Sequence, residues 1–352
     1  MQHYTFPYTE VFHCTAGDCP DSCCKGWEIV IDPKTLQTYQ QTCSPIGETI
    51  RSTLTKNEDD EWMFQNREDG NCPFWNAEKL CDLQIQAGEH LLCDTCRQFP
   101  RIPQDYTLFT EHVLSLACPE AARLVLTQTE PFQAIPLTQA EPSEPINEAE
   151  LPYSLNWMNC LLETRAVLLQ LFQETSIPLA EALCYGLHYV QQFQDWIEEK
   201  TDDFPELQPI PSEPVFLHHE SVQHLYDALE WMTPEWADWM QQIQQHPVTD
   251  ADLQAFVKIA EPWIPAFRNF CSYYLYLYWL QALNTGNALI QYQKLLTALH
   301  EIAIVSAWKL RETHTYTLTD CMIIVQRYAK EVMHDAENIE KIEDILYNLG
   351  SL

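Results

Sequence analysis

Apolar residues recur at intervals of three and four positions through most of the second half of the chain, which is the pattern of amphipathic helices. The pattern is most regular near the C-terminus, where one continuous apolar stripe predicts a single helix over residues 318–348. The same spacing predicts helices over residues 155–172, 183–197, 217–245, 250–260, 263–284 and 288–311. The C-terminal 200 residues are therefore predicted to be all-α.

The N-terminal third lacks this periodicity and predicts short, irregular elements instead. Residues 27–32 alternate well enough for a short strand, and residues 33–42 read as a short helix with Asp32 as its N-cap. Residues 57–69 are acidic and polar, which indicates an exposed loop. Pro119 stands at a plausible first position of a further helix.

Proline-rich stretches divide the chain. Residues 129–152 carry five prolines and five glutamates, which is typical of a linker, and residues 201–214 form a second break. We predict a Cys-rich domain at residues 1–128 and an α-helical domain at residues 153–352. The predicted fold class is mainly α, with a small irregular domain followed by an all-α helical domain.

Composition narrows the classes of function. A hydrophobic content of 46% indicates a globular protein, and the eight glycines are scattered singly, so no Gly-rich phosphate or dinucleotide loop is present. The net charge of −32 repels nucleic acid and attracts basic partners, although it also serves solubility alone. No signal peptide or apolar run of membrane-spanning length occurs, and we expect a cytoplasmic protein without a membrane span.

Nine of the fourteen cysteines form two tight constellations in the first 118 residues. Their thiolates are soft ligands, which select zinc, copper(I) or iron–sulfur clusters. Nine exceed the four ligands of one site, so either two sites exist or some cysteines pack as small apolar residues. Cys43 lies outside the pattern. The candidate metal ligands are Cys14, Cys19, Cys23 and Cys24 in the first constellation and Cys72, Cys81, Cys93, Cys96 and Cys118 in the second.

The adjacent pair Cys23-Cys24 restricts the kind of site. Successive side chains diverge in extended chain, so both thiols cannot easily bind one metal ion. A cluster of several irons, or two neighbouring sites, accommodates such a pair more readily. A secreted disulfide scaffold is the alternative, but the missing signal peptide and the length of the chain argue against it.

Short motifs follow one another in a fixed order between residues 14 and 123. The order of these motifs resembles the flagellin lysine-N-methylase family, and the C-x3-CC, C-P-F and C-R-x-F-P pieces also resemble a broader class of small zinc- or iron-chelating cysteine domains. Over the helical remainder the resemblance is looser and rests on Arg268-Asn269-Phe270. The motifs are Cys14-Thr-Ala-Gly-Asp-Cys19-Pro-Asp-Ser-Cys23-Cys24-Lys-Gly-Trp27, Asn71-Cys72-Pro-Phe74, Leu80-Cys81-Asp-Leu-Gln84, Cys93-x2-Cys96-Arg97-x-Phe99-Pro100-Arg101 and Cys118-Pro-Glu-Ala-Ala-Arg123.

The resemblance implies methyl transfer from S-adenosylmethionine to flagellin lysines, with an iron–sulfur cluster, expected to be 4Fe–4S, in the Cys-rich part. Zinc is the alternative metal. Arg97 and Arg101 are candidates to hold the carboxylate of the methyl donor, or else form structural ion pairs. Trp27 is expected to cover the metal site. No catalytic base is assigned.

Other readings stay open at this stage. The aromatic segment 270–279 is either a cage for a lysine ammonium or part of the core, and helical spacing favours the core. The acidic runs 58–61 and 141–150 are either docking sites for a basic substrate or solvated loops. The protein as a whole is alternatively a zinc-stabilised binding protein without catalysis, or an iron–sulfur redox or assembly factor.

Overall fold

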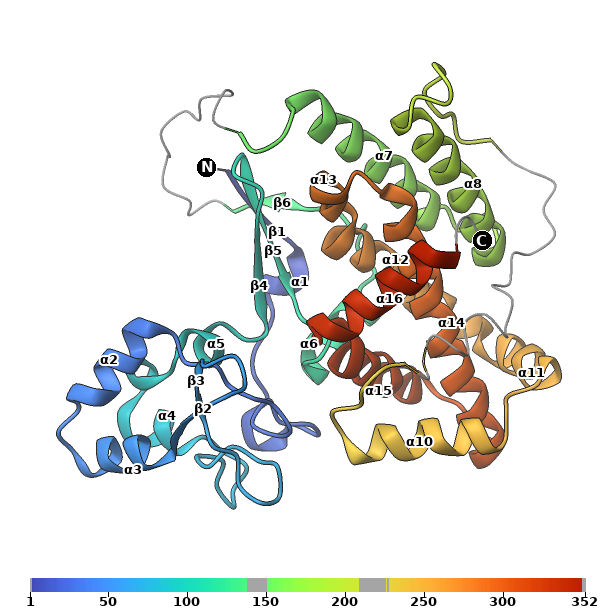
Figure 1. The fold of residues 1–352 in the computed structure, drawn as a ribbon. Coiled ribbons are helices and arrows are strands. Elements are labelled where there is room, and N and C mark those ends of the chain that lie inside the picture. The colour runs from blue at the N-terminus through green and yellow to red at the C-terminus, as the bar shows by residue number, and fades with distance from the viewer. Residues whose placement is uncertain (1, 138–150, 209–225, 227, 350–352) are drawn as a thin grey trace.

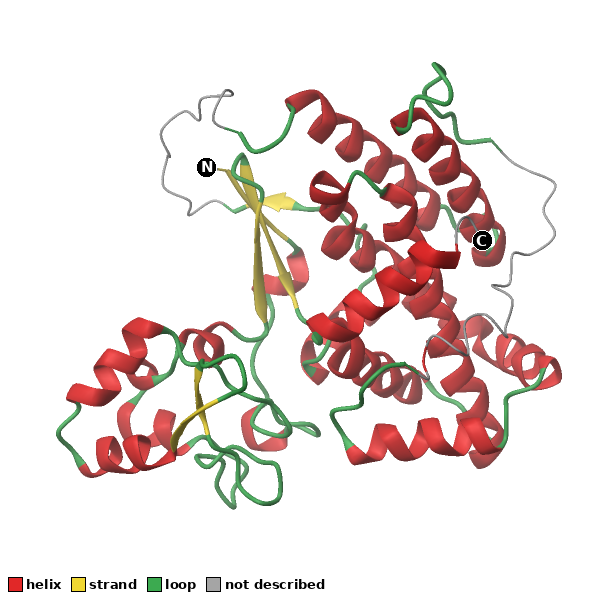
Figure 2. Cartoon of the chain, in the orientation of Figure 1, coloured by secondary structure: helices red, strands yellow, loops and turns green. Residues whose placement is uncertain are grey.

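The structure is a computed structural model that describes residues 2–137, 151–208, 226 and 228–349. Most of the described residues are helical, and the strands lie within the first 136 residues (Figure 2). Figure 1 shows a small unit beside a larger helical part, with a narrow ribbon of strands between them. The mainly α fold class is thus confirmed for this part of the chain. The N-terminal third, predicted to be irregular, also holds a small sheet.

The small unit contains short helices that begin at N-cap residues followed by proline. Asp32 and Ser44 accept hydrogen bonds from the backbone N–H groups of Thr35 and Gly47, and a proline follows each cap. The predicted helix after Asp32 is confirmed. The elements of the unit are η1 (Ala16–Asp18), α2 (Pro33–Gln41), α3 (Pro45–Thr53), β2 (Leu54–Lys56), β3 (Trp62–Phe64), α4 (Asp82–Ala87), η2 (Glu89–Leu91) and α5 (Asp94–Gln98).

Two predictions for this unit are wrong. Residues 27–32 form no strand: only Val30 makes an isolated bridge, to Met63, because the partner β3 is three residues long. The acidic stretch 57–69 is not simply an exposed loop, since it contains β3. Met63 and Phe64 are buried there, so the apolar Trp-Met-Phe run outweighs its acidic flanks.

A four-stranded sheet joins segments that are far apart in sequence. β4 (Arg101–Asp105) and β5 (Phe109–Leu114) form an antiparallel hairpin, and β1 (Gln2–Thr5) adds in parallel to β5. β6 (Ile135–Pro136) completes the order β4-β5-β1-β6. Neighbouring helices are α1 (Pro7–Glu10) and α6 (Pro119–Thr127), and α6 confirms the helix predicted to begin at Pro119.

The helical part follows the predicted periodicity closely where it is described. Capping boxes at Thr249–Asp252 and Thr317–Asp320 begin two of its helices. The helix predicted over 217–245 is not continuous: Tyr226 is helical, residues 228–233 are not, and α10 begins at Pro234, while residues 217–225 lie outside the described residues. The elements are α7 (Leu155–Gln173), α8 (Leu179–Ile197), α10 (Pro234–Gln245), α11 (Asp250–Ala260), η4 (Glu261–Trp263), α12 (Ile264–Tyr278), η5 (Trp279–Gln281), α13 (Ala282–Thr285), α14 (Ala288–Thr313), α15 (Leu318–Tyr328), the π-helix η6 (Ala329–Met333) and α16 (Ala336–Leu349).

The helix predicted over 318–348 is not continuous. It divides into α15 and α16, which the π-helix η6 separates. Lys330 and Glu331 within η6 are only 2% and 1% exposed, so this turn buries two charged side chains. The apolar stripe does not reveal the break, because Val332 and Ala336 keep their helical spacing.

A single large apolar core joins the sheet to the helices. It includes Phe6, Val113 and Val125 from the N-terminal third together with Leu161 and Tyr292 from the helical part. Beside this core, Arg165 of α7 makes a bidentate ion pair with Glu111 of β5, and both side chains are buried. The small unit has a separate core of its own. Among the helices that the structure describes, none combines the length and the apolar composition of a membrane span.

Candidate functional site

Five of the nine candidate cysteines belong to the core of the small unit. Cys72 and Cys93 are buried in it, and three others pack against it with part of their surface exposed. The core also contains Phe64 and Phe74, so these thiols share it with aromatic side chains. We refer to this set as the core thiols: Cys24, Cys72, Cys81, Cys93 and Cys96.

The core thiols contact one another directly. The backbone N–H of Cys72 donates to the carbonyl of Cys24 at 2.9 Å, and the two thiols also hydrogen-bond. Hydrogen bonds from Cys23 and Cys72 lower the pKa of Cys24. Cys93 and Cys96 lie on one turn at the start of α5, where a hydrogen bond from the Cys96 thiol lowers the pKa of Cys93. The same hydrogen bonds raise the pKa values of the donors Cys72 and Cys96, so each pair favours one thiolate beside one thiol.

The other four cysteines lie where the N-terminal loop meets the start of α6. Cys14 and Cys23 are exposed, whereas Cys19 and Cys118 are partly buried. Cys23 interacts electrostatically with Cys14 and Cys118, and Cys118 with Cys19 and Cys14. Burial raises the pKa of Cys118 to about 11, against the opposing effect of the N–H groups of Ala121 and Glu120. We refer to this set as the junction thiols: Cys14, Cys19, Cys23 and Cys118.

The spatial grouping differs from the grouping along the sequence. Cys24 follows Cys23 in the first constellation, yet its side chain joins the core thiols. Cys118 closes the second constellation, yet it lies with the junction thiols. The peptide bond between Cys23 and Cys24 therefore connects the two sets. The Cys23 and Cys24 thiols hydrogen-bond to each other, so the two sets are in contact at this pair, and the divergence of adjacent side chains expected from the sequence is not observed here.

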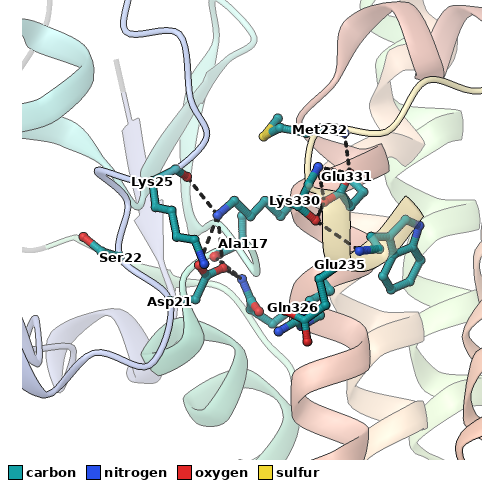
Figure 3. Close-up of polar contacts among 12 residues, drawn as sticks. Asp21, Ser22, Lys25, Ala117, Met232, Glu235, Gln326, Lys330 and Glu331 are labelled. Atoms are coloured by element: carbon teal, nitrogen blue, oxygen red, sulfur yellow. Dashed lines mark hydrogen bonds and ion pairs between the residues drawn. The ribbon is translucent and has the colours of Figure 1, made fainter. Parts of the chain in front are cut away.

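Two side chains of the helical part hold the loops that carry the junction thiols. Lys330 extends from η6 to Asp21, with Nζ 3.1 Å from Oδ2, and also donates to the Lys25 carbonyl at 3.1 Å (Figure 3). Gln326 donates to Asp21 Oδ2 at 3.0 Å and to the Ala117 carbonyl at 2.9 Å. Asp21 lies between Cys19 and Cys23, and Ala117 precedes Cys118. Gln326 at the end of α15 and Lys330 in η6 thus hold the loop that carries Cys19 and Cys23, and Gln326 also holds the segment before Cys118.

The same turn of η6 holds a second segment of the helical part. Glu331 accepts hydrogen bonds from the backbone N–H groups of Met232 at 2.7 Å and Thr233 at 3.1 Å (Figure 3). Burial raises the pKa of Glu331, although these hydrogen bonds oppose the rise. Adjacent Lys330 and Glu331 therefore point to opposite partners, the N-terminal loop and the segment before α10.

Trp27 packs at this junction against side chains from both parts. Its ring meets Phe99 and His334 edge-on at centroid distances of 5.8 and 5.6 Å, and Lys330 Nζ lies 5.6 Å from the ring centroid. Trp27 Nε1 is buried without a hydrogen-bond partner among the described residues. A cover over the metal site remains the predicted role of this residue.

His334 is a residue of the junction that the sequence did not point to. Its Nε2 hydrogen-bonds with the Ser115 hydroxyl. Burial lowers the pKa of His334 to about 4, so the imidazole is neutral at physiological pH. Lys330, Gln326 and Asp21 were missed as well, because a lysine or glutamine on a helix gives no local signal that it faces a loop more than 200 positions away.

The two candidate donor-binding arginines make local contacts. Arg97 pairs with Asp94 at 2.7 Å and donates to the Leu92 carbonyl. The Arg101 guanidinium lies 5.3 Å from the centroid of the Phe12 ring. Both side chains keep exposed surface. Their role in binding a methyl donor stays a prediction.

The aromatic segment 270–279 belongs to the core. Tyr273, Tyr274 and Trp279 are at most 2% exposed, and Tyr276 and Tyr278 are also buried. Trp279 Nε1 donates to the Leu161 carbonyl at 2.8 Å. The core interpretation is confirmed, and these rings form no open cage for an ammonium group.

An acidic groove of about 650 Å³ lies between the small unit and the start of α16. Glu28, Glu58 and Asp59 line it from one side and Glu337 from the other. Asn66, which also lines the groove, donates to the Trp27 carbonyl at 2.9 Å. Part of the acidic run 58–61 therefore lines a groove with its side chains exposed, whereas the run 141–150 lies outside the described residues.

The thiols are free, and none is part of a disulfide. Within the described residues, no group of three or more His, Cys, Asp or Glu side chains already has the arrangement of a metal site. Cys43 is exposed and belongs to neither set of thiols. His13 and His90, which neighbour the constellations, are exposed.

Comparison with known proteins places the chain in a family. It is 34% identical over 120 residues to the flagellar biosynthetic protein FliU of Salmonella muenchen, a match that covers 33% of this chain and 71% of that protein. The chain belongs to the flagellin lysine-N-methylase family. The lysine-N-methylases of Salmonella typhimurium and Salmonella choleraesuis are also 34% identical over 120 residues, but the match covers only 30% of each. No protein-family model and no solved structure matches the chain.

Proposed function

We propose that this member of the family transfers methyl groups from S-adenosylmethionine to lysine side chains of a protein substrate, flagellin, and carries an iron–sulfur cluster. The family membership supports the activity, because two relatives bear the name lysine-N-methylase. The two sets of thiols support the binding of a metal or an iron–sulfur cluster. The acidic groove supports a substrate that presents lysines.

The donor set fits a soft metal or a cluster. The junction thiols number four, which is the ligand count of a 4Fe–4S cluster, and they combine exposed with partly buried side chains. Trp27 and Trp75 hold buried indole N–H groups without hydrogen-bond partners among the described residues, and such donors stabilise thiolate or sulfide. A cluster bound here supplies one-electron chemistry and a Lewis-acidic iron.

The transfer itself needs a neutral amine. The lone pair of the lysine Nζ attacks the methyl carbon, the carbon–sulfur bond breaks, and its electron pair stays on sulfur, which leaves S-adenosylhomocysteine. The nitrogen then loses one proton to a base or to water. Carboxylates such as Glu28 and Glu337 attract the lysine but raise its pKa. The acidic groove therefore serves docking, and the transfer belongs at the less acidic junction beside Trp27.

Mass spectrometry tests the activity. The full chain, purified and reconstituted with iron and sulfide without oxygen, is incubated with flagellin and S-adenosylmethionine. We expect the mass of one methylene group to be added per methylated lysine, and no addition when S-adenosylhomocysteine replaces the donor. A Cys23→Ser variant should lose the activity, and a Cys43→Ser variant should keep it. Unmodified flagellin with the cluster-loaded protein contradicts this function.

A zinc-stabilised binding protein is the second candidate, because the core thiols are buried or partly buried in the core of the small unit, as the ligands of a structural zinc site are. It predicts a colourless protein with zinc and without inorganic sulfide. The iron–sulfur proposal predicts a brown, oxygen-sensitive protein. Metal and sulfide analysis after anaerobic purification separates the two.

A further inference from the structure

We infer that the nine cysteines form two separate centres with different tasks: the core thiols hold a structural metal inside the small unit, and the junction thiols hold the accessible, reactive one. The division itself stands on the structure alone. Only the reactive task of the junction centre rests on the proposed function.

Packing separates the two sets. All five core thiols belong to the apolar cluster of the small unit, whereas Cys118 packs against the large core of the helical part. The backbone hydrogen bond from Cys72 to Cys24 anchors Cys24 to the second constellation. The Cys23 and Cys24 thiols hydrogen-bond to each other, so the two centres meet at this pair, with Cys24 packed in the small unit and Cys23 beside Cys14 and Cys118.

The exposure of the thiols indicates which centre is structural and which is reactive. Structural sites are closed by their ligands and their surroundings, whereas reactive sites keep an accessible side. Cys72 and Cys93 are buried, so the core thiols suit a closed site. Cys14 and Cys23 are exposed, so a donor molecule has access to the junction thiols.

The polar contacts also differ between the sets. Lys330 and Gln326 hold the loops of the junction thiols, and the buried Lys330 ammonium is paired there with the Asp21 carboxylate. The core thiols instead depend on the core of the small unit. The junction centre is therefore coupled to the helical part.

The decisive variants are Cys24→Ser and Cys118→Ser, because sequence order and spatial position assign these residues differently. Each is made in the full chain, reconstituted without oxygen with iron, sulfide and zinc. Bound metal and acid-labile sulfide are then counted per chain, and the spectrum of the bound centres is recorded. Cys43→Ser is the matched control.

We expect two centres in the unaltered chain and in the Cys43→Ser variant. Cys118→Ser should lose the junction centre, like Cys19→Ser, and keep the core centre. Cys24→Ser should lose the core centre, like Cys72→Ser, and show a lower melting temperature. A single centre per chain, or loss of the same centre in Cys24→Ser and Cys118→Ser, overturns the inference.

A second measurement uses the unaltered chain, so that the inference can be tested even if the variants do not fold. The metal-loaded, unaltered chain is treated with a mild chelator, and thiols are labelled with an alkylating reagent over time. We expect Cys14 and Cys23 to be labelled while Cys72 and Cys93 remain protected. Simultaneous labelling of all four overturns the inference. None of these readouts requires methylation, so two centres in a chain that methylates nothing would refute only the proposed function.

Discussion

At the scale of single residues, burial decides the charge of several side chains around the junction. His334 is neutral because its ring is enclosed by Trp27, Phe99 and the Ser115 hydroxyl. Lys330 keeps a partner, Asp21, although only 2% of its surface is exposed. Local signals predicted the cap at Asp32 and the helix start at Pro119 correctly. No local signal marks His334 or Lys330, because their surroundings come from distant segments.

His334 predicts a pH dependence of stability. Its pKa is about 4 in the folded chain, below the ordinary value of 6.5. Between these pH values the unfolded chain binds a proton that the folded chain does not, so stability falls as the pH drops from about 6.5 to about 4. The contribution is on the order of 2–3 kcal/mol. Urea titrations across this range measure it.

The matched variant is His334→Gln, which cannot titrate. Its free energy of unfolding should change less with pH in this window than that of the unaltered chain. The difference between the two proteins isolates His334 from the many carboxylates that also titrate at low pH. Equal slopes would show that His334 is not buried in its neutral form.

At the scale of elements, the π-helix η6 organises the junction. Its wider turn directs Lys330 to the N-terminal loop and Glu331 to Met232 and Thr233 (Figure 3). The apolar pattern predicted the helices on either side but not the interruption. The periodicity of the sequence shows which face of a helix is apolar. The position of a π turn depends instead on polar partners from other segments, which the periodicity does not contain.

The ion pair between Lys330 and Asp21 is testable with a double-mutant cycle. Lys330→Met and Asp21→Asn should each destabilise the chain by roughly 2–4 kcal/mol, because each leaves the charge of a buried or half-buried partner without an opposite charge. The double variant should lose less than the sum, with a coupling energy of about 1–2 kcal/mol. Denaturant unfolding gives all four values.

The control pair lies on the surface. Lys200 contacts Asp195 and Glu198, and all three side chains are exposed. Lys200→Met should leave stability nearly unchanged, because solvent screens exposed pairs. Additive effects of Lys330→Met and Asp21→Asn would show that the two side chains do not interact in solution.

At the scale of the whole molecule, two cores and a large negative charge define the protein. The core of the small unit encloses five thiols, and the large core joins the sheet to the helices. The net charge of −32 makes the folded chain repel itself. Salt should screen the buried pair Arg165–Glu111 and the partly buried pair Lys330–Asp21 less than it screens the exposed carboxylates.

The charge predicts that salt stabilises the protein. Raising NaCl from about 10 mM to about 150 mM shortens the Debye length from about 30 to about 8 Å and weakens the repulsion between carboxylates. The melting temperature should therefore rise, as calorimetry can measure. An uncharged osmolyte at equal osmolality should produce a smaller rise. A melting temperature that falls with salt would show that attractive surface pairs dominate.

The sequence by itself determined what depends on neighbouring residues: the helical spacing of the second half, the caps of short helices and the ordered cysteine motifs that indicate the family. Only the tertiary structure decided which cysteines share a set, where the last predicted helix divides, and that β1 pairs with β5. The reason is the range of the interactions. Caps and periodicity act over a few residues, whereas Cys24, Cys118 and Lys330 meet partners brought together only by folding.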